Sequence, residues 1–330
     1  MSAFRRASSA YNQLMKLKLI IASLLLTFVA TAGSAREYAL TPDSDVIGEV
    51  EVIQAVYEDT FVRLARRFDV GYEELARANP GVDPWLPGEG TEIIIPTRYV
   101  LPDAPRQGIV INIPEFRLYY FPEGDSGRVI THPIGTGRQG WDTPYGRTSV
   151  VRKRHLPTWT PPQSVRDEHA ARGDILPAVV AAGPDNPLGE HALYLGFASY
   201  LIHGTNDSRG VGMRVSHGCI RMFPEDIEAL FQVVEPGVQV TIVNQPYKLG
   251  WGEGGLFLEA HPPLVEESEQ WTATELTRLF VAATDERSVQ VRWDQSEAVM
   301  AEGRGMPEFV SVEGTITVAE LLTDDSPPGE

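Results

Sequence analysis

Apolar positions along residues 46–97 change from strand-like to helical spacing and back again. Strand-like runs occupy residues 51–56 and 91–96. Between them, four apolar residues recur at helical spacing: Phe61, Leu64, Ala65 and Phe68. A second short helix is expected over residues 72–78, because the Asn-Pro-Gly turn that follows is typical of a helix end. The pattern therefore predicts a compact unit with the order strand, helix, helix, strand.

Residues 108–245 carry short apolar runs separated by Pro, Gly and Asp. Six of these runs are expected to be strands: residues 109–113, 116–121, 128–134, 192–197, 200–203 and 238–244. Residues 135–138 indicate a hairpin turn, and one helix is expected to begin at Pro224. Residues 157–187 are rich in proline with little periodicity, which is typical of a long loop or lid. We therefore expect a mainly β chain with few helices, in which the larger domain is a β-sandwich or barrel-like fold.

Three flanking segments complete the division of the chain. Residues 98–107 form a Pro-rich linker, which is expected to be stiff and extended. Residues 246–330 form a C-terminal extension with one expected strand, one expected helix and an acidic tail. Residues 1–35 carry two lysines, an apolar run and then small residues, which is the layout of a Sec-type signal peptide. The expected location is the periplasm, with an uncleaved inner-membrane anchor as the alternative.

The charge balance argues against one large class of partner. The chain has 28 Lys and Arg against 45 Asp and Glu, which gives a formal net charge of −17. Residues 1–35 contain four basic residues and no acidic ones, so their removal leaves −21. Such a surface repels phosphate backbones and anionic lipid headgroups, and nucleic acid is therefore not an expected partner. The single cysteine also excludes an internal disulfide.

The candidate chemistry centres on that cysteine, Cys219. It lies in the run Ser-His-Gly-Cys-Ile-Arg-Met over residues 216–222, and His203 precedes it by sixteen residues. Neighbouring His and Arg charges lower the pKa of a thiol and favour the nucleophilic thiolate, so Cys219 is expected to be reactive. A buried, inert cysteine is the alternative. No metal or other cofactor is expected, because five further histidines lack metal-ligand spacing: His132, His155, His169, His191 and His261.

The order of a strand, His203-Gly204-Thr205, a glycine-rich loop and Ser-His-Gly-Cys-Ile-Arg resembles the catalytic domain of YkuD-type L,D-transpeptidases. The similarity extends from about residue 109 to residue 244, and residues 157–162 and 183–189 resemble members from diderm bacteria. This resemblance implies a peptidoglycan L,D-transpeptidase. Its cysteine attacks a stem tetrapeptide at the third residue, releases D-alanine and passes the acyl group to an amine. The implied acceptor is another stem peptide, giving a 3-3 cross-link, or an outer-membrane lipoprotein.

Matched residue by residue, the resemblance implies that Cys219 is the nucleophile and His203 the general base. The Gly204 carbonyl would orient the imidazole, and the amides of His217, Gly218 and Cys219 would form an oxyanion hole. Four side chains are expected to contact substrate: Tyr200, Arg214, Ser216 and Arg221. Alternatives are a structural ion pair for either arginine, a core position for Tyr200, and His217 as the base.

Residues 46–97 resemble a LysM module, a small carbohydrate-binding domain of cell-wall proteins. The similarity rests on the βααβ order and on the turns Asn79-Pro80-Gly81 and Leu86-Pro87-Gly88. It implies binding to peptidoglycan glycan. Two positions depart from the LysM pattern, Glu58 where Gly is usual and Gly71 where Ser or Thr caps a helix. Both are expected in loops that line the sugar groove, so a spacer without glycan affinity is the alternative.

Two other functions stay open for the whole chain. If water resolves the thioester, the protein is an L,D-carboxypeptidase or another hydrolase that uses the same nucleophile. A non-catalytic wall-binding protein is the second alternative, against which the presence of both His203 and Cys219 weighs. The sequence does not indicate the natural acceptor, the oligomeric state or the role of residues 246–330.

Overall fold

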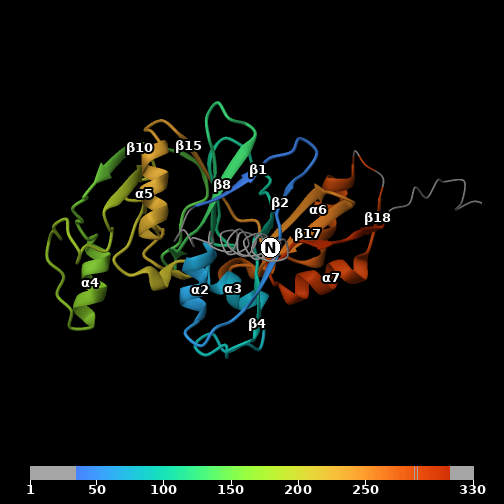
Figure 1. Cartoon of the computed structure of the whole chain (residues 1–330). Coiled ribbons are helices and arrows are strands. Elements are labelled where there is room, and N and C mark those ends of the chain that lie inside the picture. The colour runs from blue at the N-terminus through green and yellow to red at the C-terminus, as the bar shows by residue number, and fades with distance from the viewer. Residues whose placement is uncertain (1–34, 286, 288, 313–330) are drawn as a thin grey trace, which may run out of the picture. The chain divides into compact units, whose positions relative to one another are not determined.

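The computed structural model describes residues 35–285, 287 and 289–312 (Figure 1). The predicted signal peptide up to residue 34 and the predicted acidic tail from residue 313 lie outside this part of the chain. Across the described ranges, no helix has both the length and the apolar character needed to cross a membrane.

The largest sheet confirms the mainly β class. Its order is β1 (Arg36–Ala39), β8 (Arg128–Pro133), β7 (Arg117–Phe121), β6 (Gly108–Asn112), β15 (Gln239–Val243), β10 (Gly146–His155), β11 (His191–Leu195), β12 (Leu201–His203) and β14 (Ile220–Arg221). Two neighbouring pairs, β6 with β15 and β12 with β14, are parallel, and the other neighbours are antiparallel. All six strands predicted within residues 108–245 are present.

The hairpin of β6 and β7 is buried on both faces, because alternate residues enter different cores. Ile109 and Ile111 contribute to the main core, whereas Val110 enters a second core. That second core also contains Tyr99 and Leu101 of the segment predicted as a linker. On the other side of the sheet, the predicted helix α5 (Pro224–Val233) supplies the main core with Ile227 and Leu230 (Figure 1).

Residues 51–95 follow the predicted element order, with β3 (Glu51–Gln54), α2 (Phe61–Phe68), α3 (Tyr72–Ala78) and β4 (Glu92–Ile95). The Thr60 hydroxyl caps α2 by accepting a hydrogen bond from the Arg63 amide at 3.3 Å. These elements share a core that includes Phe61, Leu64 and Leu75. β3 and β4 pair in antiparallel register, so the unit closes on itself.

Gly71 precedes α3 and is buried against the larger domain. A Cβ atom at this position would lie 3.0 Å from the Gly212 Cα, and the Glu73 amide donates to the Gly212 carbonyl at 3.3 Å. The expectation that Gly71 lines an open groove is therefore wrong, because residue 71 is a packing position between two backbones.

The segment predicted as a stiff, extended linker is packed against the rest of the fold. It begins with β5 (Arg98–Val100), which pairs with β2 (Val46–Gly48). Val100 donates its amide to the buried Glu259 carboxylate at 2.6 Å. Residues 98–101 thus connect the small unit, the large sheet and the C-terminal region.

The C-terminal region is a folded unit with its own core. β16 (Tyr247–Gly252), β17 (Gly255–Ala260) and β19 (Glu308–Phe309) form one sheet, β18 (Gln290–Val291) pairs with β20 (Ser311–Val312), and the helical elements are η2 (Val265–Gln270), α6 (Ala273–Thr284) and α7 (Trp293–Glu302). β16 was not predicted, because glycines interrupt its apolar pattern. Gly250 is required there, since a Cβ atom would lie 2.6 Å from Val100 Cγ1.

Three further elements differ from the sequence prediction. The predicted loop 157–187 contains α4 (Gln163–Ala171), of which only Val165 is buried. β10 was not predicted, because its side chains are mainly polar and only Val150 is buried. The predicted hairpin turn contains β9 (Thr136–Gly137), which pairs in parallel with β13 (Arg214–Ser216). Pairing with residues almost eighty positions away leaves no signal in the local pattern.

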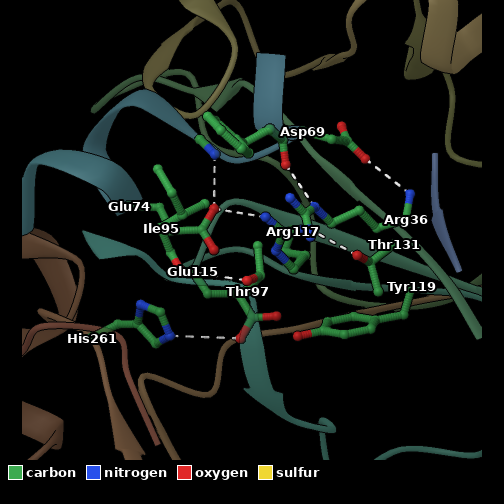
Figure 2. Close-up of polar contacts among 12 residues, drawn as sticks. Arg36, Asp69, Glu74, Ile95, Thr97, Glu115, Arg117, Tyr119, Thr131 and His261 are labelled. Atoms are coloured by element: carbon green, nitrogen blue, oxygen red, sulfur yellow. Dashed lines mark hydrogen bonds and ion pairs between the residues drawn. The ribbon is translucent and has the colours of Figure 1, made fainter. Parts of the chain in front are cut away.

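A buried ion pair joins the small unit to the large sheet. Arg117 Nη2 of β7 lies 2.7 Å from Glu74 Oε2 of α3, and both side chains are at most 3% exposed. Figure 2 shows Arg117 between Glu74 and Thr131, whose hydroxyl accepts from Nη1 at 3.0 Å. Glu74 also accepts the Gly71 amide at 2.7 Å. Both Nη atoms of Arg117 and the Oε2 atom of Glu74 therefore have defined partners.

Candidate active site

The parallel pair of β12 and β14 brings the two candidate catalytic residues to one face. Ile202 lies opposite Ile220, and His203 lies opposite Arg221. Both isoleucines enter the main core, at 0% and 1% exposure. Since side chains alternate along extended chain, His203, Arg221 and Cys219 share the opposite face, with Cys219 diagonal to His203.

The backbone fixes the tautomer of His203. Its Nδ1 lies 2.6 Å from the Gly204 carbonyl oxygen, as the sequence analysis expected. A carbonyl only accepts hydrogen bonds, so Nδ1 carries the proton and Nε2 has a free lone pair. Burial lowers the pKa of His203 to about 4, and the nearby Arg221 charge adds to this effect. The imidazole is therefore neutral at pH 7 and available as a base.

The thiol differs from the expectation of a lowered pKa. Burial raises the pKa of Cys219 to about 11, although the Leu201 amide and the Arg221 charge act in the opposite direction. Sγ lies 3.7 Å from the Ser199 carbonyl, to which it donates. Among the described residues no hydrogen bond joins Cys219 to His203. In the resting state both groups are thus neutral, and the thiol points to the Ser199 carbonyl, so it must rotate toward His203 before it reacts.

The turn before Cys219 is organised by Ser216. Its hydroxyl donates to the Cys219 carbonyl at 2.6 Å and accepts the Gly218 amide at 3.1 Å. These bonds correct two expectations, since Ser216 is used internally rather than by substrate, and the Gly218 amide is already engaged. The amides of His217 and Cys219 have no acceptor within the described chain, which leaves these two donors for an oxyanion.

Gly218 is required by both conformation and space. Its φ of +100° favours glycine, and a Cβ atom would lie 2.8 Å from Tyr200 Cε1. Tyr200 therefore contacts the catalytic turn, and its hydroxyl donates to the Asp142 carbonyl at 3.2 Å. Its ring therefore packs against the turn that precedes Cys219.

His217 faces α4 rather than the thiol. Its Nε2 lies 2.9 Å from Glu168 Oε2 of α4 and 3.2 Å from Arg138 Nη2. Its ring packs edge-to-face on Trp141, with centroids 4.6 Å apart. His217 thus belongs to a polar cluster with Arg138 and Glu168. These contacts weaken its candidacy as the base.

The two candidate arginines differ in their partners. Arg214 forms ion pairs with Glu266, at 2.6 Å, and with Asp142, at 3.1 Å. This matches the structural ion pair that was the alternative for Arg214. Arg221 has no ion pair within the described part of the chain, and its buried Nε makes no hydrogen bond. Arg221 is therefore the cation that retains the capacity to bind a carboxylate beside Cys219.

Several residues that shape the site were not identified from the sequence. Gly137 contacts the catalytic turn, because a Cβ atom there would lie 3.0 Å from Gly218 Cα. Ser199 provides the carbonyl that holds the resting thiol and has a φ of +73°. Glu168 and Arg138 hold His217. Only the Gly-Thr-Gly run at residues 135–137 was a visible signal, and it was interpreted as a turn.

Comparison with known proteins places these residues in a family. Residues 106–242 match the YkuD family, described as the L,D-transpeptidase catalytic domain. The chain is 43% identical over 282 residues to the probable L,D-transpeptidase YbiS of Escherichia coli, covering 84% of this chain and 90% of that protein. It is 50% identical over 247 residues to the probable L,D-transpeptidase YcfS of Escherichia coli, covering 72% of this chain and 77% of that protein.

A solved structure of the catalytic domain from an Enterococcus faecium L,D-transpeptidase is also similar, with 21% identity and a TM-score of 0.32. The match covers 43% of this chain and 100% of that domain. The identity to YbiS extends beyond residues 106–242 over most of both chains. This chain therefore belongs to the L,D-transpeptidase family.

Proposed function

We propose that this protein is a periplasmic, cysteine-dependent L,D-transpeptidase that acts on peptidoglycan stem tetrapeptides. The observation that supports the proposal is the register of β12 and β14, which pairs His203 with Arg221. Alternation along the chain then directs Cys219, one residue before β14, to the same face. The chain needs no cofactor for this reaction, since thiol, base and oxyanion donors all come from its own residues.

The first half-reaction makes a thioester. His203 Nε2 takes the thiol proton as Sγ of Cys219 attacks the carbonyl carbon of the third stem residue. The amides of His217 and Cys219 stabilise the negative oxygen of the tetrahedral intermediate. The imidazolium then protonates the nitrogen of the departing D-alanine, so the C–N bond breaks and the acyl group remains on sulfur.

The second half-reaction regenerates the thiol. The acceptor amine attacks the thioester carbonyl while His203 removes its proton, and the C–S bond breaks as Cys219 is reprotonated. Arg221, with its unpaired Nε, binds a carboxylate of the stem peptide during both steps. Acceptors of matching chemistry are the side-chain amine of a second stem peptide and a lysine of an outer-membrane lipoprotein.

Product analysis with the full chain tests this proposal. Disaccharide-tetrapeptide is incubated with the protein, and the products are followed by mass spectrometry. We expect release of D-alanine together with a cross-linked dimer. Release without dimer supports the hydrolase alternative, and no release supports the non-catalytic alternative.

Arg221→Met should still release D-alanine but with a raised KM, because the cation proposed to bind a stem carboxylate is removed.

The pH dependence of kcat/KM should reflect the protonation of His203. His203 accepts a proton only when it is neutral, and burial lowers its pKa to about 4. Activity should therefore be nearly constant from about pH 6 to pH 8 and fall about tenfold per pH unit well below pH 4. The measurement is kcat/KM for tetrapeptide in constant-ionic-strength buffers. An acid limb centred near pH 6.5 would show that His203 is not in the buried environment described.

We also propose that residues 46–97 form a LysM-like module that binds peptidoglycan glycan. The supporting observation is an exposed apolar group on two adjacent loops. Tyr57 is 74% exposed and Trp85 is 65% exposed, and the Phe61 amide joins the two loops by donating to the Pro84 carbonyl at 2.8 Å. Aromatic faces of this kind stack on sugar rings.

Glycan binding by this unit is tested by cosedimentation with peptidoglycan sacculi, using Cys219→Ala chains so that no covalent attachment occurs. Trp85→Ala should weaken binding about tenfold, which corresponds to about 1.4 kcal/mol. Trp293→Ala is the matched control, since Trp293 is also exposed but lies in α7. Equal binding by the two variants would favour the spacer alternative.

A further inference from the structure

Three buried polar side chains meet where the small unit joins the large sheet. Asp69 follows α2, His132 belongs to β8, and Asp226 lies in the first turn of α5. Their exposed fractions are 3%, 1% and 1%. One potential ligand atom from each lies within 4.8 Å of the other two, and His132 Nδ1 lies 3.5 Å from Asp226 Oδ1.

Each of these side chains has a buried atom that makes no hydrogen bond in the described chain. The atoms are Asp69 Oδ1, His132 Nδ1 and Asp226 Oδ2. The remaining oxygen of Asp69 is used, because Oδ2 accepts the Arg36 amide at 3.2 Å (Figure 2). Buried polar atoms without partners are costly, by about 1–3 kcal/mol each. Asp69 and Asp226 can hydrogen-bond each other only if one of them is protonated, and burial raises the pKa of both carboxyls. Either a shared proton or a bound cation would therefore complete the cluster.

The described residues supply these carboxylates with positive charge only through His132 or from a greater distance, since the Arg117 charge lowers the pKa of both. Apart from His132, no basic nitrogen lies within the 4.0 Å of an ion pair from Asp69 or Asp226. The neighbouring Arg117 directs its Nη atoms to Glu74 and Thr131 (Figure 2). Apart from His132, the two buried carboxylates thus have no cationic group of the described residues in direct contact, which favours a positively charged ligand between them.

A second cluster in the same protein provides an internal comparison. Glu115, Glu259 and His261 are also buried and also have ligand atoms within 4.8 Å of one another. Here, however, the Lys248 ammonium forms ion pairs with both glutamates, at 2.8 Å from Glu259 Oε1. The chain supplies its own cation in this cluster, whereas the Asp69 cluster has none.

We propose that Asp69, His132 and Asp226 bind a divalent transition-metal ion, for which Zn²⁺ is the best match. Zn²⁺ bonds of about 2.0–2.2 Å to imidazole nitrogen and carboxylate oxygen place neighbouring ligands about 3.3–3.5 Å apart in tetrahedral geometry. The separation of 3.5 Å between His132 Nδ1 and Asp226 Oδ1 agrees with this. Two carboxylates also neutralise a divalent charge.

The proposed ion is structural. Its ligands come from the residue that follows α2, from β8 and from α5, so one ion would tie residues 51–95 to the sheet and to the helix that covers the main core. The proposed metal site and the candidate active site use different elements, since none of the metal ligands belongs to β12, β14 or the turn between residues 216 and 219. Metal content should therefore correlate with thermal stability.

The test uses the full chain carrying Cys219→Ala, which removes the thiol as a competing ligand. The protein is stripped with chelator, dialysed against Zn²⁺ and analysed by elemental mass spectrometry. We expect about one Zn²⁺ per chain and a higher melting temperature with metal. Asp226→Asn and His132→Gln should each lower the Zn²⁺ content per chain at least tenfold. His261→Gln is the matched control and should retain it, because Lys248 already serves that cluster.

Two results would overturn the proposal. One is substoichiometric Zn²⁺ in the Cys219→Ala chain, which would mean that the carboxylates share a proton instead. The other is unchanged binding in Asp226→Asn and His132→Gln. If those variants do not fold, zinc-edge anomalous diffraction from the Cys219→Ala chain gives the answer, since the ion either lies between Asp69, His132 and Asp226 or lies elsewhere.

Discussion

Cys219→Ala is expected to abolish acyl transfer, with D-alanine release reduced at least about 10⁴-fold. The reason is that no other described group replaces the thiol on the face that carries His203 and Arg221. Water attacking directly would still have the His217 and Cys219 amides as donors, so a small residual hydrolysis is compatible with the account. The measurement is the rate of D-alanine release from disaccharide-tetrapeptide.

The matched control for this prediction is Arg209→Ala. Arg209 lies in η1 (Ser208–Gly210), in the same loop between His203 and Cys219, but it is exposed and pairs only with Asp207. We expect this variant to keep wild-type activity within about twofold. Residual activity of Cys219→Ala above about 1% of wild type would mean that another residue is the nucleophile. Thermal unfolding of both variants shows whether the fold is retained.

Glu74→Leu is expected to destabilise the protein by about 3–5 kcal/mol. The substitution leaves the Arg117 guanidinium buried at 1% exposure with its ion pair removed, and an uncompensated buried charge is strongly destabilising. It also removes the acceptor of the Gly71 amide. The measurement is the free energy of unfolding from urea titration followed by circular dichroism.

Two further variants isolate the cause. Glu73→Gln is the matched control, because Glu73 lies in the same helix and forms an i,i+4 pair with Arg77 that is only partly buried, with side chains 20% and 34% exposed. We expect its loss to cost clearly less than that of the fully buried pair. Glu74→Leu combined with Arg117→Met should recover much of the loss, because both charges are then removed. If Glu74→Leu costs no more than Glu73→Gln, the buried pair does not hold the small unit to the sheet.

Local pattern was sufficient for elements whose residues alternate or repeat. The strands around His203 were predicted because Ile202 and its neighbours alternate between core and site, and the helices of residues 61–78 because Leu64 and Leu75 lie on apolar stripes. The motif around Cys219 also identified the nucleophile candidate and the Gly204 contact of the base.

Long-range contacts limited the prediction of the site. Glu266 and Asp142 occupy Arg214 through ion pairs that span 52 and 72 positions of the chain, which the sequence does not reveal. The expected low pKa of Cys219 was wrong for a similar reason. Residue identity reveals neighbouring charges, but the burial that raises the pKa to about 11 depends on the folded structure.

The central claim is that Cys219 carries the acyl group during turnover. Wild-type protein is mixed with disaccharide-tetrapeptide, quenched in acid during the first turnovers and analysed by intact-protein and peptide mass spectrometry. The account predicts an added mass equal to the disaccharide-tripeptide acyl group, which is the substrate without its D-alanine, located on the peptide that contains Cys219 and removed by hydroxylamine. D-alanine release with unmodified Cys219 at every quench time would contradict it.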